Sequence, residues 1–398
     1  LFLKFICYST SMLMTRLIIL SLLVLMAAPL SKAQTDRIRS IVASTGKQYA
    51  PDKRQSVFEI SVSDDKDGWI TVSGKTSDAV AFEALGREIG KSGLKVRNKV
   101  SLLPSDRWAM PVISVANIRT RPSHSAELAS QVLMGMPLRE LERDGNWLRV
   151  QCPDGYIGWI ACSSVTKRSD ADMRRWRSAE RAVVTSVYQV RCYRAADASS
   201  TRDVVSDLVN GDIVELTGLT KGSRSQIILP DGRKAWVDVG DITPAGEWAA
   251  RTFDAGKILD MAYSMEGQPY LWGGTSTKSL DCSGLVKVCY LANGIILRRD
   301  ASQQAVTGRR IEAGDWRSCR AGDLLFFGNA KSGKVTHVAI YDNNGAYIHS
   351  SGRVMRNSVD PASDRYLPTP FLHCVRIDGC EGSDGITRAK DHPWYFNL

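Results

Sequence analysis

A chain of 398 residues is long enough for roughly two to four domains, and a hydrophobic fraction of 43% is typical of globular proteins. The formal net charge is +10, and the Lys and Arg residues are scattered along the chain rather than gathered in a basic stripe. This pattern argues against a nucleic acid partner and favours an anionic polymer such as a cell wall.

The first 33 residues have the features of a secretory signal peptide. Arg16 precedes the apolar run 17–25, and Ser31, Lys32 and Ala33 include small residues at the cleavage positions. The run is short for a membrane span, so we expect a soluble exported protein, periplasmic or secreted, without a stable membrane span after cleavage. An uncleaved anchor is the weaker alternative.

Residues 34–104 are predicted to form a small α/β domain. Strands are expected over residues 57–62 and 69–73, followed by an amphipathic helix over 77–91 and a strand over 95–103. No catalytic cluster falls in this region, and Pro104 marks its boundary.

An internal repeat follows this domain. Pro153-Asp154-Gly155 with Trp159 recurs as Pro230-Asp231-Gly232 with Trp236, and every position is offset by 77 residues. Short strands separated by Gly, Pro and Asp turns predict two small β-barrels, over residues 108–165 and 182–243. The charged stretch 167–177 is expected to link them.

The region 252–380 is predicted to be a single α+β domain. Helices are expected over residues 255–265 and from Cys282 onward, and strands over 323–327, 336–341 and 346–350.

Two cysteines, Cys282 and Cys289, lie on the second of these helices. A helix separates them by roughly 10 Å, which is too far for a disulfide. We expect Cys289 to be a buried apolar residue. Cys282 opens the helix, where backbone N–H groups favour the thiolate and lower the pKa of the thiol, so it is the candidate nucleophile.

Two of the five histidines, His337 and His349, fall on consecutive predicted strands. One could act as a general base and the other could orient it. Both side chains lie on one face only if the loop between the strands has an odd number of residues. We therefore predict a three-residue loop, 343–345, with Gly345 at positive φ, instead of the two-residue turn that Asn344-Gly345 favours. The other histidines, His124, His373 and His392, have no catalytic context.

Eight cysteines would remain after removal of the leader, and none has C-x-x-C spacing. We therefore expect no metal site and no cofactor.

Several motifs in residues 252–380 resemble the NlpC family of papain-like cysteine peptidases. They are YLWGG at 270–274, DCSG at 281–284, RDASQQ at 299–304, GDLLFF at 322–327, HVAIY at 337–341 and YIHS at 347–350. The segments 108–165 and 182–243 resemble bacterial SH3 domains, which bind cell-wall peptides. The resemblance implies a multidomain chain: a small α/β unit, two SH3-like β-barrels and a C-terminal α+β papain-like domain.

The same resemblance implies a thiol protease of peptidoglycan. Relatives of this architecture are γ-D-glutamyl-diamino acid endopeptidases, which cut the bond between γ-D-glutamate and diaminopimelate or Lys in murein stem peptides or released murein peptides. The family pattern makes Cys282 the nucleophile, His337 the base and His349 the orienting group. It also implies a substrate-binding set: Tyr270 near the oxyanion, Trp272 as a pocket wall, Asp281, Ser283 and Ser302.

Asp281 has two expected roles. It would hold the free ammonium of an N-terminal L-alanine, and it would also cap the helix that Cys282 opens. In relatives the first SH3-like domain closes one end of the active site and admits peptides with a free N-terminus. The matching residues here are Glu127 and Tyr156.

Two other functions stay open at this point. One is a non-catalytic cell-wall-binding protein, against which the intact set of Cys282, His337 and His349 argues. The other is an amidase or acyltransferase on the same fold, because fold and triad do not fix the substrate.

Overall fold

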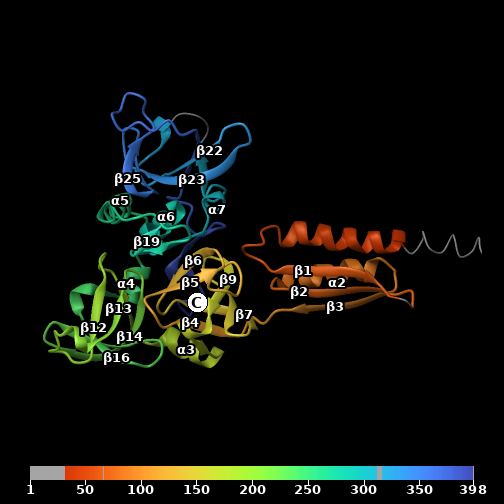
Figure 1. Cartoon of the computed structure of the whole chain (residues 1–398), viewed down its shortest axis with the longest axis horizontal. Helices are drawn as coiled ribbons and strands as arrows, with labels where there is room; N and C mark the ends of the chain where they lie inside the picture. The colour runs from red at the N-terminus through yellow and green to blue at the C-terminus, as the bar shows by residue number, and fades with distance from the viewer. Residues whose placement is uncertain (1–31, 66, 312–315, 398) are drawn as a thin grey trace, which may run out of the picture. The chain divides into compact units, whose positions relative to one another are not determined.

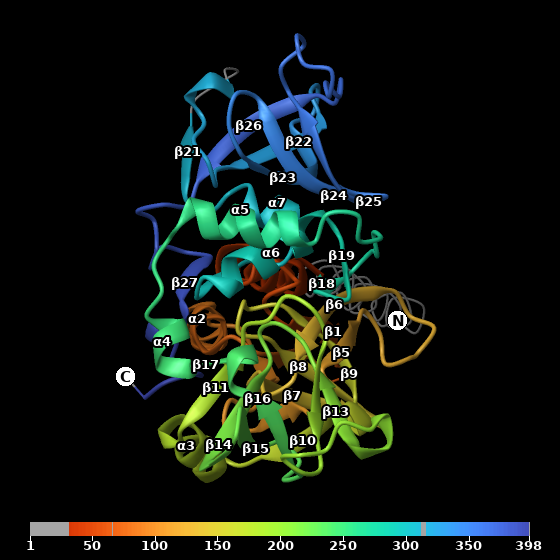
Figure 2. The ribbon, with the colours of Figure 1, turned by 90° about the vertical axis from the view of Figure 1, so that its left-hand side faces the viewer.

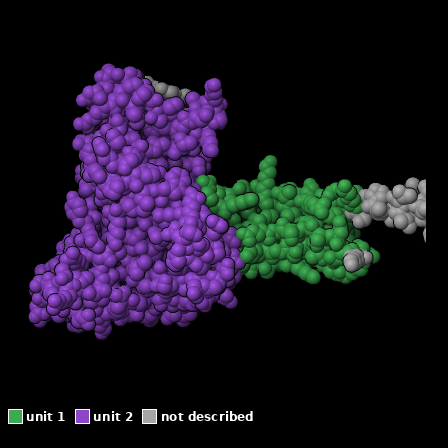
Figure 3. All heavy atoms as spheres, viewed as in Figure 1, with its two compact units in different colours: residues 1–103 green, residues 104–398 purple. Residues whose placement is uncertain are grey.

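The computed structural model describes residues 32–65, 67–311 and 316–397. Apart from Lys32 and Ala33, the predicted signal peptide lies outside the described residues. The chain divides into two compact units, residues 1–103 and 104–398 (Figure 3). Over the described ranges, no helix combines the length and the apolar character needed to cross a bilayer.

The first unit is a three-stranded sheet with helices. A helix over residues 32–49, which the sequence did not predict, is followed by β1 (Phe58–Asp64), β2 (Ile70–Thr76), α2 (Ala79–Lys91) and β3 (Val96–Leu102). β1 and β2 pair antiparallel, and α2 is the crossover between the parallel strands β2 and β3. Ile38 and Val42 of the first helix pack with residues of β2 and α2 in one core.

Two seven-stranded sheets follow in the second unit. The first contains β4 (Trp108–Pro111), β5 (Val115–Arg119), β6 (Leu128–Leu133), β7 (Leu138–Asp144), β8 (Trp147–Gln151), β9 (Ile157–Ala161) and β10 (Val165–Arg168). The second contains β11 (Arg181–Val184), β12 (Val190–Tyr193), β13 (Val204–Leu208), β14 (Ile213–Lys221), β15 (Arg224–Ile228), β16 (Lys234–Asp238) and β17 (Ile242–Pro244).

The two sheets have the same topology. In each, the last strand pairs with the first, and the second strand lies between the third and the sixth. Trp159 pairs with Arg119 in one sheet as Trp236 pairs with Tyr193 in the other. The internal sequence repeat is therefore also a structural repeat.

The stretch 167–177 lies between the two sheets, as expected of a linker, but it is structured, which the sequence did not predict. Its start completes β10, which pairs with β4. The rest forms α3 (Asp170–Ser178), which is capped by Ser169 and buries Met173 and Trp176. These two residues are three apart, as helical periodicity requires for a shared face, but the surrounding charges obscure that signal.

The C-terminal region has a six-stranded antiparallel sheet in the order β21-β26-β22-β23-β24-β25. Its strands are β21 (Arg309–Ile311), β22 (Leu324–Asn329), β23 (Lys334–Tyr341), β24 (Ala346–Ser351), β25 (Arg353–Ser358) and β26 (Phe371–Arg376). The helices α5 (Ala255–Ser264), α6 (Cys282–Ala292) and α7 (Ala301–Gln304) lie along one side of this sheet (Figures 1 and 2). Ile258, Leu285, Phe326 and Val338 belong to the core between them.

The shorter elements of this region are α4 (Ala245–Ala249), β18 (Thr275–Ser276), β19 (Ser279–Leu280), β20 (Ile295–Leu297) and β27 (Ile386–Arg388). The predicted end of the domain at residue 380 is too early, because β27 pairs with β20. Beyond it, Tyr395 is 1% exposed and packs in a cluster with Trp108 and Trp248. The C-terminal segment thus joins the core that the first sheet shares with α4.

The hairpin of β23 and β24, which carries His337 and His349, has the predicted strand register. Ile340 lies opposite Ile348, and Asp342 N–H donates to Ala346 C=O, so residues 343–345 form the loop. Gly345 has a φ of 81°. The odd loop puts His337 and His349 on the same face of the sheet, as predicted.

Candidate active site

Cys282 is the first residue of α6, and Asp281 is its N-cap. The Cys282 thiol is 8% exposed and faces the backbone N–H groups of Ser283 and Val338. Cys289 is fully buried, and neither cysteine is in a disulfide. The burial expected of Cys289 is confirmed, and the role of Cys282 as the nucleophile stays a prediction.

Close backbone contacts explain the glycines of the two motifs around Cys282. A Cβ on Gly284 would lie 1.9 Å from the carbonyl oxygen of Gly274, and one on Gly273 would lie 2.4 Å from that of Leu128. Gly273 also has a φ of 83°. Only glycine allows α6 and the first barrel to approach this loop so closely.

The predicted lowering of the Cys282 pKa is wrong. Burial and the neighbouring Asp281 carboxylate raise the pKa of the thiol to about 11, and the backbone N–H groups of Val338 on β23 and Ser283 on α6 offset only part of this. Cys282 therefore rests as a neutral thiol, and to act as a nucleophile it would need a base to remove its proton.

His337 and His349 form the expected pair. His337 Nε2 lies 2.7 Å from His349 Nδ1, and His349 Nε2 lies 2.9 Å from Oδ1 of Asn357 on β25. Burial, with a smaller contribution from His349, lowers the pKa of His337 to about 4. Burial also lowers the pKa of His349. At neutral pH both rings are uncharged, so His337 is available as a base.

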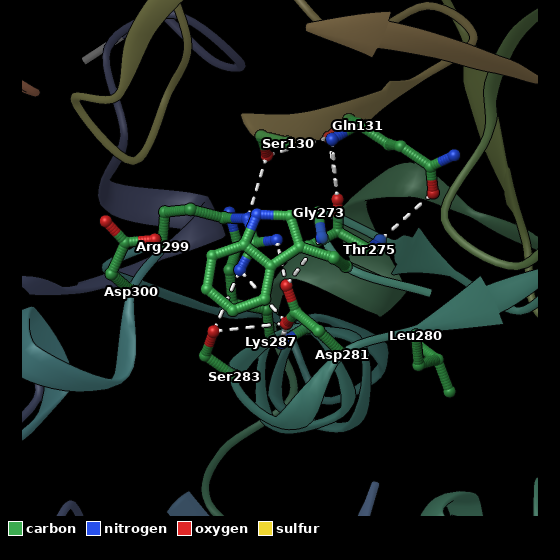
Figure 4. A network of polar contacts seen from close by, with 12 residues as sticks. Ser130, Gln131, Gly273, Thr275, Leu280, Asp281, Ser283, Lys287, Arg299 and Asp300 are labelled. Atoms are coloured by element: carbon green, nitrogen blue, oxygen red, sulfur yellow. Dashed lines mark hydrogen bonds and ion pairs between the residues drawn. The ribbon is translucent and has the colours of Figure 1, made fainter. Parts of the chain in front are cut away.

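Arg299 binds the start of α6. Its guanidinium is 1% exposed and donates from Nη2 to Asp281 Oδ2 at 2.6 Å and from Nη1 to Ser283 Oγ at 2.8 Å. Its Nε donates to Ser130 Oγ of β6 at 3.1 Å. Figure 4 shows this network, in which one arginine connects the first barrel to the residues on either side of the nucleophile.

The Asp281 carboxylate has its hydrogen-bonding capacity filled. Oδ1 accepts from Gly284 N–H at 2.7 Å, and Oδ2 accepts from Gly273 N–H at 2.9 Å as well as from Arg299. The predicted cap is present. Because Arg299 already neutralises the carboxylate, the cap and the ion pair account for Asp281 without a substrate ammonium.

The first barrel meets the catalytic region through Glu127. Its Oε1 accepts a 2.8 Å hydrogen bond from Nε1 of Trp272, and the Trp272 side chain is 62% exposed. Tyr156 is buried in the barrel core, whereas Ser302 is exposed on α7. Burial raises the pKa of Tyr270 to about 12, and an ionised Cys282 nearby also raises it, so its hydroxyl stays a donor.

The hairpin β18–β19, just before Cys282, is held by both seven-stranded sheets. Gln131 N–H donates to Thr275 Oγ1 at 2.8 Å, and Thr275 N–H donates back to Gln131 Oε1 at 3.0 Å. Lys278 on the same hairpin binds Asp207 of β13 at 2.6 Å. The two sheets therefore help to fix the segment that precedes Cys282.

Within the described residues, Cys319, Asp323 and Cys374 form one buried group with the donor types of a metal site. Asp323 Oδ1 and Oδ2 accept from Arg376 at 3.0 and 2.7 Å. This arginine neutralises the carboxylate, so we assign the group no part in catalysis.

Arg299 and Asn357 were missed as site residues. Arg299 lies in the RDASQQ motif, so the sequence held a signal for it. Asn357 had none, because its place depends on the pairing of β24 with β25.

A thiol at a helix start, beside two neighbouring strands that each present one of two hydrogen-bonded imidazoles, defines a papain-like cysteine hydrolase. The comparisons give the same class. The chain belongs to the NlpC/P60 family, whose profile matches residues 267–376, and residues 118–165 match the bacterial dipeptidyl-peptidase SH3 domain.

Three relatives illustrate the likeness. The chain is 26% identical over 259 residues to a Bacillus cereus gamma-D-glutamyl-L-lysine dipeptidyl-peptidase, covering 62% of this chain and 74% of that one. It is 29% identical over 275 residues to dipeptidyl-peptidase 6 of Lysinibacillus sphaericus, covering 65% and 94%. It is 38% identical over 106 residues to the probable endopeptidase NlpC of Escherichia coli, covering 26% and 67%.

A solved structure has the same fold. The NlpC/P60 family protein from Bacillus cereus aligns with a TM-score of 0.57 at 22% identity, over 68% of this chain and 99% of that one. The alignment is too long for the C-terminal region alone, so it extends into the seven-stranded sheets.

Proposed function

We propose that this protein is an exported, wall-associated cysteine peptidase that hydrolyses the bond between γ-D-glutamate and a diamino acid in peptidoglycan stem peptides. The observation that carries the proposal is the ordered pair His337–His349 beside the thiol of Cys282, at 2.7 Å between the ring nitrogens. The names of the relatives support the choice of bond. We further propose that the repeat at 182–243 is a second SH3-like domain.

The reaction would proceed by acyl transfer. His337 takes the thiol proton as Cys282 attacks the γ-carbonyl carbon of the glutamyl residue. We propose that the Tyr270 hydroxyl donates a hydrogen bond to the developing oxyanion. His337 then returns the proton to the leaving amine of the diamino acid, and water hydrolyses the thioester with His337 again as base.

The substrate is proposed to be a released peptide with a free N-terminal L-alanine. Glu127 is exposed and its carboxylate stands beside Trp272, so it is the carboxylate available to an ammonium group at this site. Because Asp281 is already paired with Arg299, we propose that Glu127 makes the main contact with the substrate ammonium. Tyr156 and Ser302 stay secondary candidates.

The test is product analysis by mass spectrometry. Purified protein is incubated with L-Ala-γ-D-Glu-diaminopimelate and, separately, with the peptide that ends in L-Lys. The proposal predicts release of L-Ala-γ-D-Glu and the free diamino acid, and no release by Cys282→Ala. Release of alanine alone, or equal turnover by the Cys282→Ala variant, would refute it.

A further inference from the structure

We propose that Asn357 is a positioning residue of the active site and that, through His349, it fixes the tautomer in which His337 can act as a base. The inference rests on the proposed peptidase function, and it adds a fourth side chain to the expected three. The donor and acceptor of each hydrogen bond around Asn357 can be assigned one after another, beginning at a carbonyl oxygen, which can only accept.

The fixed end of the chain of hydrogen bonds is the backbone carbonyl of Arg365. It accepts from Asn357 Nδ2 at 3.2 Å and from the backbone N–H of Ser358 at 2.9 Å. A carbonyl oxygen has no proton to give, so the Asn357 atom that faces it is the amide nitrogen. The other end of the same amide, the oxygen Oδ1, then faces His349.

This direction sets both imidazoles. Asn357 Oδ1 is an acceptor, so Nε2 of His349 carries the proton in the 2.9 Å contact. A neutral His349 then has a bare Nδ1, which accepts the proton on Nε2 of His337 across 2.7 Å. A neutral His337 with its proton on Nε2 has a bare Nδ1, and this nitrogen is the one free to take the thiol proton of Cys282.

The order has a catalytic consequence. When His337 gains a proton at Nδ1, its Nε2–H already donates to His349, so no ring has to turn and no second proton has to move. Without Asn357, His349 could carry its proton on Nδ1 instead. That tautomer would oppose Nε2–H of His337 and favour the His337 tautomer that has no free base.

The strand pairing explains why Asn357 can do this. Asn357 lies opposite Tyr347, and His349 is two residues further along β24, so Asn357 and His349 are diagonal neighbours on one face. Asn357 is half-buried and His349 is 1% exposed. Water is therefore a poor substitute for the amide as the acceptor for His349.

The test measures steady-state kinetics of three variants. Asn357→Ala should lower kcat about tenfold, which corresponds to about 1.4 kcal/mol, with KM changed less than about twofold. Arg365→Ala is the matched control, because it removes a side chain but keeps the carbonyl, and it should behave as the wild type. Asn357→Asp supplies an acceptor in the same place and should recover most of the activity.

The aspartate variant also gives a readout that a purely structural role would not move. The titratable groups that act on the histidine pair are Asp281, next to Cys282 at the start of α6, and Tyr347 on β24. A new carboxylate next to His349 would stabilise the imidazolium form. The acidic limb of kcat/KM should therefore move to higher pH in Asn357→Asp and stay in place in Arg365→Ala.

A second measurement separates this proposal from the proposed function. Trypsin cleavage after Lys278 and Lys287 gives a peptide, 279–287, whose only cysteine is Cys282. The folded protein is treated with iodoacetamide before digestion, and the amount of alkylated peptide over time gives the rate at which Cys282 reacts. This rate measures how well His337 removes the thiol proton, and no substrate is needed. Slower alkylation in Asn357→Ala with a wild-type rate in Arg365→Ala supports the relay even if the tripeptide is not cut.

Wild-type kcat and a wild-type alkylation rate in a folded Asn357→Ala variant would overturn the proposal. If Asn357→Ala fails to fold, as judged by circular dichroism, the Asn357→Asp variant decides. An acidic limb that coincides with that of the wild type would then overturn it.

Discussion

Arg299 and Asp281 form an ion pair that is almost inaccessible to solvent. Asp281 is the residue directly before Cys282 in the chain. Arg299 Nη2 lies 2.6 Å from Asp281 Oδ2, and the two side chains are 1% and 8% exposed. The pair also closes the cap of α6 and reaches the first barrel through Ser130. It therefore couples barrel docking to the position of Cys282.

Asp281→Asn should destabilise the protein strongly even though asparagine is a good N-cap. The change leaves Arg299 charged and buried without a counter-ion, for which we expect a loss of about 3–5 kcal/mol in the free energy of unfolding. Denaturant unfolding monitored by circular dichroism measures it. Arg298 is the matched control, because its partner Asp384 is 93% exposed, and Arg298→Ala should cost less than about 1 kcal/mol. Equal losses for the two variants would contradict the assigned role of the buried pair.

Cys282 and Cys289 should separate chemistry from stability. Cys282→Ala should abolish hydrolysis with a near-native melting temperature. Cys289 is fully buried in the core, so Cys289→Ala should leave kcat unchanged and lower the free energy of unfolding by about 1–2 kcal/mol. Peptide hydrolysis and thermal melting of both variants check this. A catalytic defect in folded Cys289→Ala would show that the two thiols are not independent.

The pH dependence follows from the buried histidine. His337 has to be neutral to act as a base, and burial lowers its pKa from 6.5 to about 4. Lowering the pH through about 4 therefore protonates the base and removes activity, whereas kcat/KM stays constant down through 6.5. Circular dichroism at each pH controls for acid unfolding. An acidic limb centred near 6.5 would mean that His337 titrates like a solvated imidazole.

Glu127 should select for a free amine. N-acetylation of the substrate removes the ammonium that would pair with this carboxylate, so we expect kcat/KM for acetyl-L-Ala-γ-D-Glu-diaminopimelate to be at least about tenfold lower. Glu127→Gln keeps an acceptor for Trp272 Nε1–H but removes the charge, and it should narrow that gap by slowing the free peptide. Equal rates for free and acetylated peptides in the wild type would point to an enzyme that works on intact wall.

Much of this architecture could be predicted from local signals. Cys282 at a helix start and the odd loop that ends at Gly345 follow from rules of capping and side-chain alternation, and the repeat around Trp159 and Trp236 is visible by spacing. The helix over residues 32–49 was missed because it adjoins the leader, and α3 because charges surround its few buried residues.

The electrostatics of the site could not be predicted in the same way. A helix start suggests a lowered thiol pKa, but the burial of Cys282 and the charge of Asp281 act in the opposite direction and are larger. The partners of Asp281 and His349 come from distant parts of the chain, Arg299 and Asn357, and only the assembled fold brings them within hydrogen-bonding distance.

The most direct test of the account is to trap the acyl-enzyme. Wild-type protein is mixed with excess L-Ala-γ-D-Glu-diaminopimelate, quenched in acid within the first turnovers, digested at low pH and examined by mass spectrometry. The account predicts an L-Ala-γ-D-Glu group attached by a thioester to Cys282, absent from Cys282→Ala. Hydrolysis of the peptide by wild-type protein with the adduct on another residue, or hydrolysis that continues in Cys282→Ala, would contradict it.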